Sequence, residues 1–178
     1  MVATKPWTLD ELHRLPDDGN KYELVRGELF VTPLPNEEHE IIAARLTDIL
    51  APYVKRHALG VVFHPRAVFR FEGSEVEPDL MVRQPKQPGT QDWTDAPIPL
   101  LIVEILSPST RRRDRQQKRS FYVDSPISEY WMADPEAKTI TRVRAGAPDE
   151  TVRDRLIWAP PGASDALTID VADLFGFL

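Results

Sequence analysis

A single carboxylate inside an apolar run constrains the fold of this chain more than any other feature. Residues 99–106, PLLIVEIL, are apolar except for Glu104. Such a run is typical of a central strand that is covered on both faces. A buried carboxylate is costly there unless it is paired, hydrogen-bonded or bound to a metal ion. The alternative is that Glu104 lies at the strand end and pairs with an arginine from the following helix.

Helical and strand patterns alternate along the chain, which predicts an α/β fold with a mixed β-sheet and flanking helices. Helices are expected at about residues 8–15, 36–53 and 110–123, the first from the capping-box spacing of TLDE and the second from an apolar stripe at Ile42, Leu46, Ile49 and Tyr53. Pro52 should kink the second helix or end it early. Strands are expected at residues 22–26, 28–32, 61–63, 67–71, 79–82, 99–106, 129–133 and 139–144, and the tail contains residues 155–158 followed by a Pro-Pro-Gly break and a short terminal element.

Length and composition restrict the class of protein. The 178 residues fit one domain spanning residues 1–178. The absence of cysteine excludes disulfides, thiolate metal sites and cysteine nucleophiles. No apolar run approaches the roughly 18 residues of a membrane span, and the first residues lack the apolar core of a secretory signal. We therefore expect a cytoplasmic protein without a membrane partner.

The charge is distributed unevenly. A formal net charge of −6 counts against a strong non-specific binder of nucleic acid. Residues 110–119, TRRRDRQQKR, nevertheless carry six basic side chains against one acidic side chain, which is a local charge of +5. This segment predicts phosphate contacts from Arg111, Arg113 and Arg115. The alternative is a solvated helix face.

Asp79 is a second acidic residue beside an apolar strand. It follows Pro78 in the sequence EPDLM, so a solvated turn is one interpretation. Together with Glu104, however, it provides carboxylates at the ends of two neighbouring strands. Such oxygen ligands suit Mg²⁺ or Mn²⁺, with water and phosphate completing the coordination. The backbone carbonyl of Ile105 is a further candidate ligand.

The helix predicted over residues 110–123 carries a third group of candidates. Asp114, Lys118 and Tyr122 are spaced four residues apart, which places them along one face of a helix. We expect Lys118 to point toward Glu104, where its ammonium would orient a metal-activated water and stabilise charge on phosphorus. The alternative is a surface pair of Asp114 and Lys118 with Tyr122 packed beneath it.

These residues carry a resemblance to known nucleases. Pro78-Asp79 followed by Glu104 resembles the PD-(D/E)XK pattern, although Leu106 stands where that pattern expects lysine. The Uma2 group of restriction-endonuclease-like proteins shows the same departure. The chain is similar to this group over about residues 20–145, in the sequences YELVRGEL (22–29), VEILSPST (103–110) and EYW (129–131), in the spacing of Asp114, Lys118 and Tyr122, and in its ending at residues 167–175.

The resemblance implies a restriction-endonuclease-like fold that hydrolyses DNA phosphodiesters with Mg²⁺ or Mn²⁺. It also implies that the helix supplies the lysine, here Lys118. Glu28, in the matching Gly-Glu-Leu motif, is a candidate fourth acid, and His39 is a candidate accessory residue. The alternatives are a surface position in the hairpin for Glu28 and a capping or packing role for His39.

Two other classes of function stay open. One is a nucleic-acid-binding or accessory module that keeps the nuclease fold without cleaving. The other is a structural homodimer in which carboxylates and arginines form a salt-bridge network. Geometry distinguishes them, because a nuclease needs Asp79 and Glu104 to converge in a solvent-open cleft. Arginines filling that cleft would favour the network.

Overall fold

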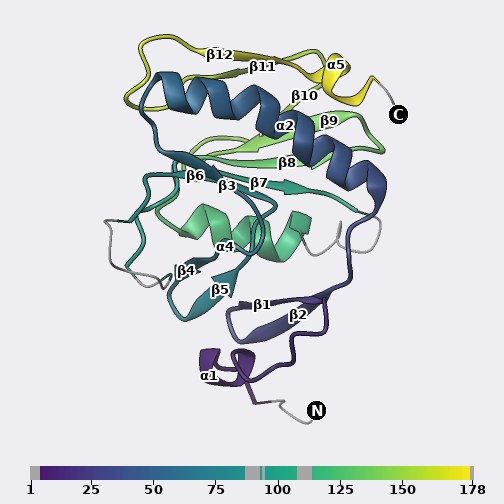
Figure 1. Cartoon of the computed structure of the whole chain (residues 1–178), viewed down its shortest axis with the longest axis vertical. Coiled ribbons are helices and arrows are strands. Elements are labelled where there is room, and N and C mark those ends of the chain that lie inside the picture. Colours follow the sequence, from purple (N-terminus) through teal and green to yellow (C-terminus); the bar gives the residue numbers. More distant parts are fainter. Residues whose placement is uncertain (1–4, 87–92, 94, 108–113, 177–178) are drawn as a thin grey trace.

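The computed structural model describes residues 5–86, 93, 95–107 and 114–176. Its larger sheet has six strands in the order β10-β9-β8-β7-β6-β3 (Figure 1). They are β3 (Val61–Phe63), β6 (Leu80–Arg83), β7 (Leu101–Ile105), β8 (Tyr130–Asp134), β9 (Thr139–Val143) and β10 (Glu150–Val152). The pair β7–β8 is parallel and the other pairs are antiparallel. All five residues of β7 are buried, which confirms the predicted central strand.

A second sheet has four antiparallel strands in the order β2-β1-β5-β4. They are β1 (Lys21–Val25), β2 (Glu28–Thr32), β4 (Phe69–Phe71) and β5 (Ser74–Val76). The predicted hairpin of β1 and β2 is confirmed, and positive φ angles at Arg26 and Gly27 form its two-residue turn. Sequence reasoning missed β5, whose three residues include a buried serine and a buried glutamate in place of an apolar pattern.

The early helices follow the predicted caps. Helix α1 (Leu9–Leu12) has the Thr8–Glu11 capping box, and Asn36 caps α2 (Glu37–Arg56). Two effects of Pro52 are predicted, a kink in α2 or an early end. The early end is wrong, because the helix continues to Arg56. Pro52 is exposed, whereas the next two residues are buried in the core. Packing of this last turn therefore outweighs the backbone cost of proline.

The third predicted helix begins differently. Residues 114–118 form a π-helix, η1 (Asp114–Lys118), which leads into α4 (Arg119–Asp124). The start of the prediction, residues 110–113, lies outside the described residues. A π-helical turn holds about one residue more than an α-helical turn and often marks a functional site.

Each face of the larger sheet packs against a helix, with α2 on one side and α4 on the other (Figure 1). Leu101, Val103 and Ile105 of β7 belong to the core on the α2 side, whereas Ile102 belongs to the core on the α4 side. Side chains alternate along a strand, so Glu104 points to the α4 side. The strands β11 (Arg155–Trp158) and β12 (Leu167–Asp170) with α5 (Val171–Phe175) complete the α2 side.

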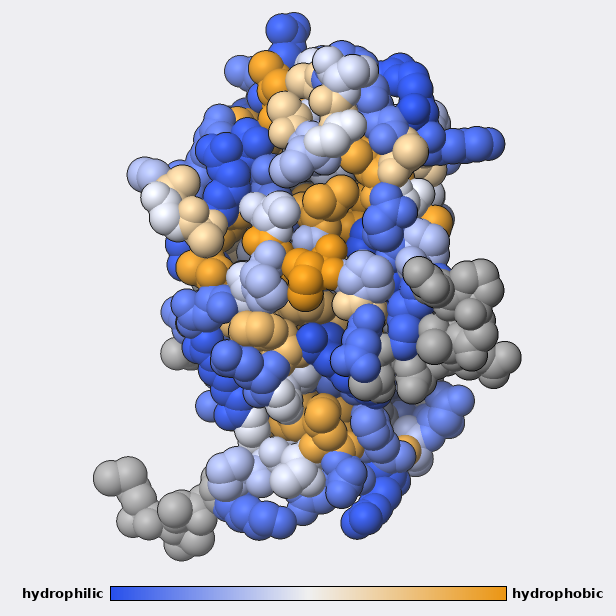
Figure 2. Space-filling view, turned by 90° about the vertical axis from the view of Figure 1, so that its left-hand side faces the viewer, coloured by the Kyte–Doolittle hydropathy of each residue, from blue (hydrophilic) through white to orange (hydrophobic). Residues whose placement is uncertain are grey.

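Figure 2 shows a face on which hydrophilic residues surround small, separated hydrophobic areas. Scattered apolar residues of this kind are normal on a protein surface and do not by themselves mark an interface. The predicted homodimer therefore stays a prediction. None of the helices in the described ranges combines the length and apolar character needed to cross a membrane.

Candidate active site

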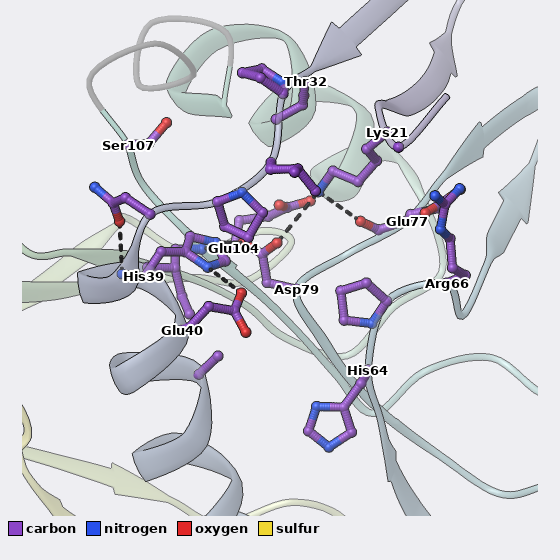
Figure 3. Close-up of a pocket in the computed structure, with 18 residues that line it drawn as sticks. Lys21, Thr32, His39, Glu40, His64, Arg66, Glu77, Asp79, Glu104 and Ser107 are labelled. Carbon is purple, nitrogen blue, oxygen red and sulfur yellow. Dashed lines mark hydrogen bonds and ion pairs between the residues drawn. The ribbon is translucent and has the colours of Figure 1, made fainter. Parts of the chain in front are cut away.

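A pocket of about 520 Å³ lies where the four-stranded sheet, the beginning of α2 and the ends of β6 and β7 in the six-stranded sheet meet (Figure 3). Its walls come from segments that are far apart in sequence. They are Gly19, Lys21, residues 32–36, His39, Glu40, Ala43, residues 64–66, Glu77, Asp79, Glu104, Ile105 and Ser107. Both predicted carboxylates, Asp79 and Glu104, are therefore in one pocket.

Asp79 is buried immediately before β6, with 6% of its surface exposed, so the solvated-turn alternative is wrong. Its Oδ2 accepts hydrogen bonds from the backbone N–H of Ile105 at 2.8 Å and lies 3.0 Å from Nε2 of His39. Its Oδ1 lies 3.3 Å from Nζ of Lys21. Burial alone would raise the pKa of Asp79, but the charge of Lys21 and the contacts with His39 and Ile105 together hold it well below its usual range. Asp79 is thus an ionised carboxylate.

Glu104 is buried on the α4 side of β7, with 2% of its surface exposed. Its Oε1 accepts hydrogen bonds from Nζ of Lys118 at 2.8 Å and from the hydroxyl of Tyr122 at 2.7 Å. The predicted direction of Lys118 is therefore observed, and among the described residues the side-chain partners of Glu104 are Lys118 and Tyr122. The arginines at positions 111–113 and the side chain of Arg115 lie outside the described residues. Burial raises the pKa of Glu104 to about 7, although the charge of Lys118 opposes this shift.

Sequence reasoning missed Glu23, a third buried carboxylate. Glu23 lies on β1 with 0% of its surface exposed, and its Oε1 is 2.8 Å from Nζ of Lys118. The same oxygen accepts a hydrogen bond from the backbone N–H of Glu77 at 3.0 Å. The signal that could have identified Glu23 is the same as for Glu104. It is a carboxylate within an otherwise apolar strand sequence, here YELV at residues 22–25. Lys118 thus bridges two carboxylates from different sheets.

Lys118 lies beneath the pocket and does not open into it. Its surface is 0% exposed, and it is not among the described residues that line the pocket. Lys118 ends η1, and Tyr122 lies one turn further along α4 on the same face. The alternative of a surface pair is therefore wrong for Lys118. The side chain of Asp114, its predicted partner, lies outside the described residues.

His39 and Glu28 have different surroundings. His39 lines the pocket and contacts Asp79. Its side chain is therefore part of the pocket and does more than cap or pack the helix. Burial alone would lower the pKa of His39, but the contact with Asp79 raises it overall. Glu28 is exposed in the hairpin, accepts a hydrogen bond from Nε2 of Gln117 at 2.7 Å and is not among the described pocket residues. The structure does not bring Glu28 to the carboxylates.

The predicted phosphate contacts are not described by the structure. Arg111 and Arg113 lie outside the described residues. Arg115 belongs to η1, but its side chain lies outside the description as well. Their contact with nucleic acid stays a prediction.

Comparison with known proteins places this arrangement in a family. A family model described as Uma2, "Putative restriction endonuclease", matches residues 9–172. The chain belongs to the Uma2 family. A crystal structure from Anabaena variabilis ATCC 29413, described as "a putative nuclease belonging to DUF820", is 23% identical. The two structures align with a TM-score of 0.82, and the alignment covers 97% of this chain and 99% of the Anabaena variabilis chain.

The structural likeness confirms the predicted α/β fold with a mixed sheet and flanking helices. A comparison with curated proteins finds no match. Family and fold together indicate a nuclease of the restriction-endonuclease type.

The donor atoms of the pocket suit a hard divalent cation held partly by water. Asp79, Glu104 and Ile105 line the same pocket, and the side-chain hydrogen bonds that described residues donate to Glu104 both go to Oε1. The other oxygen, Oε2, is the one left for a ligand. Within the described ranges no group of three or more histidine, aspartate or glutamate residues is arranged to hold a metal ion. Mg²⁺ fits a site with one or two carboxylates, because it keeps several waters and binds substrate phosphate.

We expect the stability of this Uma2 family member to depend on pH through Glu104. The folded-state pKa is raised to about 7 from the usual 4.5, so the stabilising contribution of protonated Glu104 is fully present below 4.5 and is lost as pH rises through 7. Urea denaturation in EDTA should show a lower free energy of unfolding at pH 8 than at pH 5. The lowered pKa of Asp79 acts in the opposite sense only below its usual 3.8, outside this window.

The matched variant is Glu104→Gln, which keeps the size of the side chain and cannot titrate. Its free energy of unfolding should change less between pH 5 and pH 8 than that of the wild type. The same pH dependence in both proteins would show that other groups are responsible.

Proposed function

We propose that this Uma2 family member is a Mg²⁺- or Mn²⁺-dependent endonuclease that hydrolyses DNA phosphodiesters. The observation that supports this most is the convergence of Asp79 and Glu104 in one pocket. Carboxylates in an otherwise apolar sheet are costly, and here they come from neighbouring strands, β6 and β7, at one edge. Among the described residues, the basic groups of lysine or arginine that contact these two carboxylates are lysines, Lys21 at Asp79 and Lys118 at Glu104.

Asp79, Glu104 and the backbone carbonyl of Ile105 would hold the metal ion. When bound, the ion would polarise a phosphate oxygen and lower the pKa of a coordinated water. In the hydrolysis, a bond forms from the water oxygen to phosphorus and the bond from phosphorus to the leaving sugar oxygen breaks. The water gives up a proton and the leaving oxygen takes one up. The pocket residues bind the phosphate and orient it for attack by the water.

The buried partners position the two carboxylates. Lys118 and Tyr122 both hold Oε1 of Glu104, which directs Oε2 away from them. His39 and the N–H of Ile105 hold Oδ2 of Asp79. We propose that Lys118 and Tyr122 act through Glu104, and that His39 acts through Asp79. Asp114 keeps its predicted accessory role as a proposal from the family resemblance, whereas Glu28, which does not line the pocket, is not part of the proposed metal site.

Arg111, Arg113 and Arg115 are proposed to contact DNA phosphates beside the pocket. Arg111 and Arg113 precede η1 in the sequence and Arg115 lies within it, and the last residue of η1, Lys118, contacts Glu104. A cytoplasmic location and a homodimer belong to the same proposal, as expectations from the sequence.

A second candidate function is a nucleic-acid-binding or accessory module without cleavage. Two observations favour it: the net charge of −6, and the lysine, Lys21, that already neutralises Asp79. In such a module the pocket would bind nucleic acid without hydrolysing it.

A cleavage assay distinguishes the two functions. Supercoiled plasmid and a labelled DNA duplex should be cut in Mn²⁺ or Mg²⁺ and left intact in EDTA. Glu104→Gln should lower the rate by at least about 100-fold, because it removes negative charge from the proposed metal site. Glu136→Gln, in the exposed turn after β8, is the matched control and should cut like the wild type. DNA binding without cleavage in either metal would favour the accessory module.

A further inference from the structure

The pocket contains a lysine that the sequence analysis did not identify. We infer that Lys21, not Lys118, is the cation that contacts the substrate phosphate in this pocket. The inference rests on the proposed function, because it assigns a phosphate-binding residue to the same site.

Lys21 is the first residue of β1, and its side chain reaches into the pocket from the four-stranded sheet (Figure 3). Its Nζ lies 3.0 Å from the carbonyl oxygen of Glu77 and 3.3 Å from Oδ1 of Asp79. The side chain is 17% exposed, so it is held in place yet accessible from the pocket. Its charge favours the ionised form of both Asp79 and Glu104, although burial raises the pKa of Glu104 overall, so Lys21 lies within electrostatic reach of both carboxylates.

Lys118 is not suited to touch a substrate. Its side chain is 1% exposed, and Nζ lies 2.8 Å from both Glu23 and Glu104. Moving this ammonium toward the pocket would leave two buried carboxylates without their cation, which is strongly unfavourable. Lys118 therefore stays in the interior during binding and catalysis.

Besides Lys21, the described residues that line the pocket include one arginine, Arg66, and no further lysine. Its guanidinium is 58% exposed and pairs with Asp17 at 3.4 Å, at the outer surface. Lys21, in contrast, contacts a proposed metal ligand directly. It is thus the cation next to the position where the phosphate must lie for hydrolysis.

This position gives Lys21 two opposite effects. Its ammonium competes with a divalent cation for Oδ1 of Asp79, because two positive groups repel each other at one oxygen. The same ammonium attracts a phosphate, which lysine binds as a compact point charge. Removal of the charge should therefore strengthen metal binding and weaken substrate binding.

The test is Lys21→Met, which keeps the aliphatic length and removes the charge. Calorimetric titration should show Mn²⁺ binding at least threefold tighter than in the wild type. Fluorescence anisotropy with a non-hydrolysable phosphorothioate DNA should show affinity at least tenfold weaker, and cleavage should fall at least about 100-fold. Lys21→Arg should restore most of the DNA affinity. Lys55→Met, on the exposed face of α2, is the matched control and should resemble the wild type in all three measurements.

A purely structural role for Lys21 would lower the melting temperature and weaken the binding of metal and DNA together, which contradicts the inference. Wild-type affinity for the phosphorothioate DNA in Lys21→Met also contradicts it. If Lys21→Met does not fold, Lys21→Gln serves for the same titrations. If the wild type does not cleave, the proposed function fails, and the two affinities still decide the role of Lys21: opposite changes support it, and any other result overturns it.

Discussion

Replacing Lys118 with methionine should lower the free energy of unfolding by about 3–5 kcal/mol, the range observed when one partner of a buried ion pair is removed. Lys118 has 0% of its surface exposed and joins Glu23 on β1 to Glu104 on β7. Without the ammonium, two carboxylates from different sheets would be buried near each other with no cation between them. Urea denaturation followed by circular dichroism measures the change.

Two controls make this prediction specific. Lys55→Met removes an exposed lysine and should change the free energy of unfolding by no more than about 0.5 kcal/mol. The double variant Lys118→Met with Glu104→Gln should be more stable than Lys118→Met alone, because one of the uncompensated charges is gone. A loss below about 1 kcal/mol in Lys118→Met would mean that water reaches the pair and that the burial argument is wrong.

Asp79→Asn should abolish cleavage, with a rate at least about 1,000-fold below that of the wild type, while the protein stays folded. The carboxamide has the same shape and keeps an oxygen that can accept the hydrogen bond from Ile105. It lacks the negative charge that a divalent cation requires. Single-turnover cleavage in Mn²⁺ gives the rate, and calorimetric titration should show much weaker Mn²⁺ binding.

Asp48→Asn is the matched control, because Asp48 lies on α2 with its side chain exposed. It should cleave DNA and bind Mn²⁺ like the wild type. Thermal melting of both variants separates a loss of function from a loss of fold. Unchanged Mn²⁺ affinity in folded Asp79→Asn would remove Asp79 from the proposed ligands.

The sequence determined much of this protein through local patterns. The apolar run at residues 99–106 predicted β7, and the cost of a buried charge identified Glu104 as a candidate site residue. The spacing of Lys118 and Tyr122 predicted that both lie on one helical face, with Lys118 toward Glu104, and both side chains contact Glu104. These predictions succeeded because strand and helix periodicity decide which side chains share a face.

Only the tertiary structure decided which groups meet across the sheets. Nothing near Lys21 in the sequence indicates that it contacts Asp79, 58 residues away. Nor does the helix around Lys118 show that its ammonium is buried between Glu23 and Glu104. Pro52 remains inside α2 for the same reason, since the packing of the following turn outweighs a local preference. Local sequence sets the direction of a side chain along its own element, but burial and ion pairing depend on the segments that pack against it.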